Sequence, residues 1–167
     1  MADWKAETEI DRIIDELERE YGGDAWHGNP LTQLLTGIDH VRAAAKPVPN
    51  AHSIWEIVLH MIAWKNEVRR RLQGSPAALP TEGDWPVPAH TSDEAWVDAV
   101  RALKNAHRAL VAEIQRLPEN RLFTPTNDPR NRETGHGVSY YVLLHGIVQH
   151  DVYHSGQIAL LKKALGG

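Results

Sequence analysis

Residues 150–158 read His-Asp-Val-Tyr-His-Ser-Gly-Gln-Ile, within a segment from about Val138 to Leu165 that carries apolar residues at helical spacing. This spacing predicts a long helix. Because an α-helix turns by about 100° per residue, His150 and His154 lie roughly 40° apart on one face. Two imidazoles placed in this way can share one metal ion. A third ligand must then come from a neighbouring helix.

His60 is the best candidate for this third ligand. It lies within the strongly apolar run Ile57 to Ile62, where a buried neutral imidazole needs partners for both ring nitrogens. A metal would satisfy one of them, and bundles build such sites from facing helices. The alternative stays open, because ten histidines make an i, i+4 pair common by chance and core histidines can be satisfied by hydrogen bonds.

The rest of the chain also predicts helices joined by loops. Ser53, followed by Glu56 three residues later, forms a capping-box pattern before a second helix that continues to Leu72. The loops at residues 74–90 and 122–137 are rich in proline and polar residues, and the first is long enough to be functional. The other expected segments are Ala6–Glu20 and Leu31–Val41, read as one arm broken near residues 22–30, and a third helix capped by Thr91 or Ser92 and ended by Pro118.

No alternating strand pattern and no fixed repeat is present, so the sequence predicts an all-α fold. Four amphipathic segments favour an antiparallel four-helix bundle with long loops, and those loops leave room for crossovers. The 167 residues are expected to form a single domain over 1–167.

Composition excludes several classes of function. The formal net charge of -4 is unlike that of a nucleic-acid-binding protein. No apolar run reaches the roughly 20 residues that span a bilayer, and the first residues lack a secretory signal. The absence of cysteine excludes disulfides, thiolate ligands and cysteine nucleophiles. We therefore expect a cytoplasmic protein without nucleic-acid or membrane partners.

Other residues near the histidines have two interpretations each. Asp151 either orients a ligand imidazole or is a carboxylate on the helix surface. His145 faces away from the pair and is expected to pack between helices or to be a surface group, whereas His136 is expected in a loop near the site. Four tryptophans are read as core or rim anchors, with walls of a pocket beside the metal as the alternative: Trp26, Trp55, Trp64 and Trp96.

Three stretches resemble the DinB-like (DinB/YfiT) superfamily. Residues 150–158 resemble its last-helix motif, residues 51–60 its second helix, and residues 25–28 a further segment of some members. The resemblance covers nearly the whole chain in the same order. It implies a four-helix bundle of unusual connectivity in which three histidines and waters bind one metal. His60, His150 and His154 match the ligand positions, and Asp151 and Gln157 become candidates for orienting the ligand rings.

The resemblance also implies an activity. Characterised members include thiol-dependent S-transferases and isomerases, which use low-molecular-weight thiols, and many members are homodimers. The implied metal is nickel or zinc first, with iron or manganese as alternatives, because imidazole ligands suit several ions. Thiol transfer to a small-molecule substrate is therefore the leading expectation. A metal-dependent hydrolase and a non-catalytic protein that binds metal or a small ligand remain as alternatives.

Overall fold

The computed structural model describes residues 8–133 and 137–166, and within these ranges the chain is helical. It contains no strand there, only an isolated bridge between Pro125 and Ser139. The prediction of an all-α fold is therefore confirmed. The elements are α1 (Glu9–Gly22), α2 (Leu31–Leu35), α3 (His40–Ala44), α4 (Ile54–Leu72), α5 (Asp93–Ile114), the 3₁₀ turn η1 (Glu119–Arg121), α6 (Arg130–Glu133) and α7 (Tyr140–Ala164).

Side-chain caps set where the long helices begin. The hydroxyl of Ser53 accepts from the backbone N–H of Glu56, whose carboxylate accepts from the N–H of Ser53, so the predicted capping box of α4 is confirmed. Ser92, and not Thr91, caps α5, and Ser139 caps α7. The start of the first helix was expected at Ala6, which lies outside the described residues, and α1 begins after its cap Thr8.

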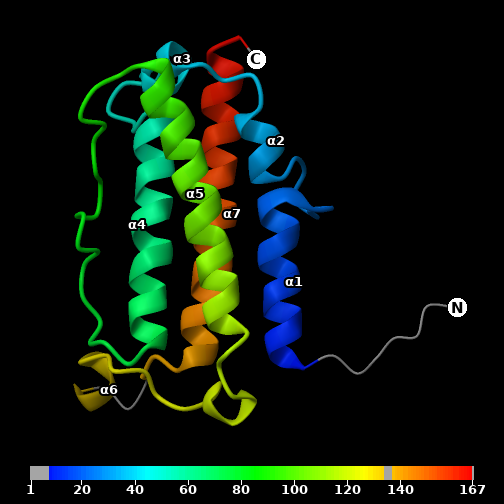
Figure 1. Cartoon of the computed structure of the whole chain (residues 1–167), viewed down its shortest axis with the longest axis vertical. Coiled ribbons are helices and arrows are strands. Elements are labelled where there is room, and N and C mark those ends of the chain that lie inside the picture. The colour runs from blue at the N-terminus through cyan, green and yellow to red at the C-terminus, as the bar shows by residue number, and fades with distance from the viewer. Residues whose placement is uncertain (1–7, 134–136, 167) are drawn as a thin grey trace, which may run out of the picture.

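The four long helices α1, α4, α5 and α7 lie side by side (Figure 1). Following the chain, α4 and α5 run in one direction and α1 and α7 in the other. The loop at residues 73–92 makes this possible, because it returns along the outside of α4 to the end where that helix begins before α5 starts. The neighbours α4 and α5 are therefore parallel, which differs from the expected antiparallel arrangement.

The arm expected over Leu31–Val41 is not continuous. It divides into α2 and α3, because Gly37 has a φ of 76°, which takes the backbone out of the helical region. Asp39 then caps α3 by accepting from the N–H of Arg42. The helix α5 ends at Ile114, one turn before the proline that was expected to end it.

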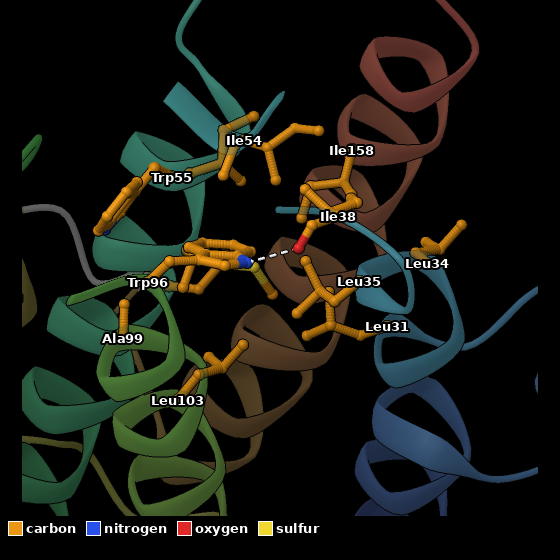
Figure 2. Packing of buried hydrophobic residues seen from close by; sticks show 14 of the residues in the cluster. Leu31, Leu34, Leu35, Ile38, Ile54, Trp55, Trp96, Ala99, Leu103 and Ile158 are labelled. Carbon is orange, nitrogen blue, oxygen red and sulfur yellow. Dashed lines mark hydrogen bonds between the residues drawn. The ribbon is translucent and has the colours of Figure 1, made fainter. Parts of the chain in front are cut away.

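The hydrophobic core has two parts. The upper part lies between α2, α3, α4, α5 and the end of α7, and contains Trp55 and Trp96. The indole of Trp96 donates to the carbonyl of Ile38 and so ties α5 to the segment between α2 and α3 (Figure 2). The lower part lies between α1 and the facing ends of α4, α5 and α7. No described helix is long and apolar enough to cross a membrane.

A layer of buried polar side chains separates the two parts of the core. Each of the four long helices contributes to it, at the position where its apolar stripe passes from one part to the other. We call these residues the polar layer: Glu20, Lys65, His107, Asp151 and Ser155.

Candidate metal centre

The structure brings the three predicted histidines together. α4 carries His60, α7 carries His150 and His154, and these two helices pack against each other. One ring nitrogen from each histidine lies within 4.8 Å of the other two, so the cluster could hold a metal ion. His60 and His154 are buried, whereas the side chain of His150 keeps 22% of its surface exposed.

An oxygen atom faces the Nδ1 atom of each ring. His60 Nδ1 donates to the backbone carbonyl of Asp84 at 2.5 Å, and His154 Nδ1 lies 2.7 Å from Oε1 of Gln157. His150 Nδ1 lies 3.5 Å from Oδ1 of Asp151, a longer contact. Asp151 and Gln157 therefore both contact ligand candidates through the nitrogen that points away from the cluster, as ring-orienting groups do.

These contacts determine which nitrogens are free to bind a metal. A neutral imidazole carries one N–H, and an oxygen acceptor at Nδ1 places that proton there, leaving Nε2 with a lone pair. The Nε2 atoms of His60 and His150 lie 2.9 Å apart. Two lone pairs at this distance need a cation or a proton between them. A divalent ion binds imidazole nitrogens at about 2.0–2.1 Å, and one ion could be reached by all three rings, so the residues fit such an ion.

Burial keeps two of the rings neutral. Desolvation lowers the pKa of His154 to about 4, and the neighbouring His150 and His60 act in the same direction. Desolvation also lowers the pKa of His60, although the carbonyl of Asp84 opposes the shift. Since only the neutral imidazole binds a metal, these shifts reduce competition from protons in mildly acidic solution.

The loop at residues 73–92 covers the cluster from outside. The indole of Trp85 stacks on the ring of His60, with centroids 3.8 Å apart, and also stacks on His52 at 3.6 Å. Asp84 accepts from the indole N–H of Trp64 at 2.8 Å, which fastens the loop to α4. Sequence reasoning placed a functional loop here but did not identify Asp84 or Trp85, because a loop pattern does not show which residue returns to which helix.

Asp151 is fully buried, so the interpretation as a surface carboxylate is wrong. Its other oxygen forms an ion pair with Lys65, which is also fully buried. The ammonium group of Lys65 keeps the pKa of Asp151 low against the effect of desolvation. Asp151 therefore connects the polar layer to His150, and Lys65 is a residue of the site that sequence reasoning missed.

The other aromatic and histidine residues have varied positions. Trp26 is fully exposed, so its assignment as a core or rim anchor is wrong, whereas Trp55 and Trp96 are buried in the core. His145 packs on Tyr141 with ring centroids 4.4 Å apart, away from the cluster. His136 lies outside the described residues.

Comparison with known proteins places the chain in a family. The sequence model of the DinB superfamily matches residues 25–158, which include all three histidines. Among solved structures, a conserved protein from Enterococcus faecalis is similar, with a TM-score of 0.71 and 14% identity, covering 97% of this chain and 100% of that one. This likeness concerns the fold alone. No curated protein matches. The chain belongs to the DinB superfamily.

Proposed function

We propose that the four long helices form the DinB-type four-helix bundle and that His60, His150 and His154 bind one divalent transition metal, nickel or zinc before iron or manganese. The observation that carries the proposal is the convergence of the rings. The Nε2 atoms of His60 and His150 lie 2.9 Å apart, while every Nδ1 in the cluster faces an oxygen. One divalent ion would satisfy the converging nitrogens of all three neutral rings.

We further propose that the protein is a thiol S-transferase acting on a small molecule with a low-molecular-weight thiol. A bound divalent ion would lower the pKa of such a thiol and so provide a thiolate near neutral pH. The chain contributes the three rings, the groups that orient them, and the indole of Trp85, which keeps water from one face of His60. The exposed part of His150 supports access by a small molecule over a closed structural site.

Elemental analysis tests the metal site. The wild-type protein should contain about one metal per chain after reconstitution with nickel or zinc, and His60→Ala, His150→Ala and His154→Ala should each contain almost none. His145→Ala, on the same helix but outside the cluster, is the matched control and should keep its metal. Stoichiometric metal in the three variants would contradict the assignment.

A second assay tests the reaction. The metal-loaded protein should consume a small electrophile only when a thiol is present, and the product should carry the sulfur. Consumption without thiol, with water as the acceptor, would instead favour the hydrolase. If neither occurs although the metal is bound, the protein binds metal without this catalysis.

A further inference from the structure

A groove of about 280 Å³ opens beside the exposed edge of His150. It runs between the second half of α4 and the first half of α7, and His150 lies in its wall. Apolar side chains and one glycine form most of the lining: Trp64, Val68, Val142, Leu143, Gly146 and Ile147. The groove and the candidate metal centre therefore share a residue, and a molecule lying in the groove has one end at the histidine cluster.

A second hollow on the other side of the cluster is a weaker candidate. It is of similar size, about 330 Å³, but it reaches the cluster only through Gln157. Gln157 contacts the Nδ1 atom of His154, which points away from the other rings. A molecule there would lie behind the cluster, whereas one in the first groove lies against a ring that could bind the metal.

Gly146 keeps the groove open. It lies one helical turn before His150, and a Cβ atom added to it would meet no other heavy atom within 4 Å. A glycine in the middle of a helix costs roughly 0.5–1 kcal/mol relative to alanine, so the position has a stability cost that packing does not explain. A larger side chain at this position would enter the groove.

The charges at the groove are positive. Arg71 and Arg130 line it, and among the described residues of its lining none is acidic. Both guanidinium groups are held in place by carboxylates, Arg71 by Glu67 and Arg130 by Asp128. Glu67 and Asp128 do not line the groove, so the two guanidinium groups are the charges that border it. A cationic ligand would therefore be disfavoured relative to an anionic one.

We propose that this groove binds the apolar body of the small-molecule substrate, with an anionic or neutral end near the arginines and the reactive end at His150. The inference rests on the proposed function for the identity of the reactive end, but the binding of an apolar anion does not depend on the metal. Gly146 is the residue that determines how large the substrate can be.

The matched probes are phenylbutyrate and phenylbutylamine, which have the same apolar body and opposite charges. Binding is followed by the amide NMR shifts of Leu143, Gly146 and Ile147, in metal-free and in zinc-loaded protein. We expect phenylbutyrate to move these resonances and to bind about threefold more tightly than the amine, as one partly exposed charge interaction allows. Gly146→Leu should weaken the binding by about tenfold, because the leucine side chain fills part of the groove and the ligand loses its apolar contact there.

Gly156→Leu is the matched control, because Gly156 lies on the same helix, is equally open, and borders a different hollow. It should leave the affinity unchanged. Val142→Glu is a second variant at an exposed position and should make the amine the tighter ligand. Absence of shifts in the groove, or equal affinity in Gly146→Leu and wild type, would overturn the inference. If phenylbutyrate binds in the groove but the protein takes up no zinc, the inference about the groove stands and the proposed metal-dependent function is contradicted.

Discussion

Two groups of polar side chains share the helices α4 and α7, and they satisfy their polar atoms differently. In the polar layer, Lys65 faces Asp151, so positive and negative charges are paired. In the histidine cluster, the Nε2 atoms of His60 and His150 face each other. The ion pair of Lys65 and Asp151 is complete with protein atoms alone, whereas one oxygen of Glu20 and both ring nitrogens of His107 have no hydrogen-bond partner among the described residues. Buried polarity therefore does not identify a metal site by itself, whereas three ring nitrogens within 4.8 Å of one another could hold an ion.

The protonation states of Glu20 and His107 reduce the cost of burying these two residues of the polar layer. Burial, with help from the charge of Asp151, raises the pKa of Glu20 to about 7, so its carboxyl group is partly protonated near neutral pH. The hydroxyl of Ser155 donates to Oε1 of Glu20 at 2.5 Å. Burial lowers the pKa of His107 to about 4, and its ring stacks on Tyr21 with centroids 4.0 Å apart. Each group adopts the state that costs least in the interior.

The largest expected effect comes from breaking the ion pair of the polar layer. Lys65→Met leaves the charge of Asp151 buried without a partner, which should lower the free energy of unfolding by about 3–5 kcal/mol. Urea denaturation of the metal-free protein measures it. Lys65→Met/Asp151→Asn should recover much of the loss, because the amide is neutral and keeps an oxygen for His150. A loss below about 1 kcal/mol in the single variant would contradict the pairing.

Next in size is the pH dependence due to Glu20. Its folded pKa lies above the value of about 4.5 for a free carboxyl group, so the folded state holds more protons and stability falls as the pH rises from about 4.5 to about 7. Glu20→Gln removes this loss. The variant should equal the wild type at pH 4.5 and exceed it by about 3 kcal/mol at pH 8. Glu16→Gln, on the exposed side of α1, is the control and should show no such gain. If the stability of Glu20→Gln changes with pH in the same way as that of the wild type, the raised pKa of Glu20 is refuted.

The histidine cluster should respond to metal where the polar layer does not. Zinc at a hundred times its dissociation constant should raise the free energy of unfolding by about 2.7 kcal/mol, and a chelator should reverse the gain. Glu20→Gln, in the polar layer, should retain the gain and His60→Ala should lack it. Thermal unfolding at fixed protein concentration provides the measurement. Equal stabilisation of His60→Ala would place the ion elsewhere.

The smallest expected effect concerns the orientation of one ring. Gln157→Leu removes the oxygen at Nδ1 of His154 and should weaken zinc binding by about tenfold, or about 1.4 kcal/mol. Competition with a metal-sensitive dye gives the affinity. Gln149→Leu makes the same change at an exposed position of α7 and should have no effect. If the two variants bind zinc equally, Gln157 does not support the site.

The sequence was enough to predict the helical class, the capping box at Ser53 and the three histidines that come together. These features depend on local rules: a helical period, a cap three residues from its partner, and two histidines one turn apart. The direction of α5 is different, because it depends on where a loop of about twenty residues returns, and proline and polar residues do not specify that path.

The sequence contains a pattern that indicates the polar layer, but our predictions did not use it. Glu20, Lys65 and His107 each continue the apolar stripe of their helix, where a polar residue is out of place. One such residue has no interpretation by itself. Only the tertiary structure decides that the residues meet at one level, that Lys65 neutralises Asp151, and that Asp84 and Trp85 close over His60. Local periodicity determines the face of each residue, whereas the partner on another helix is determined by packing over long sequence separations.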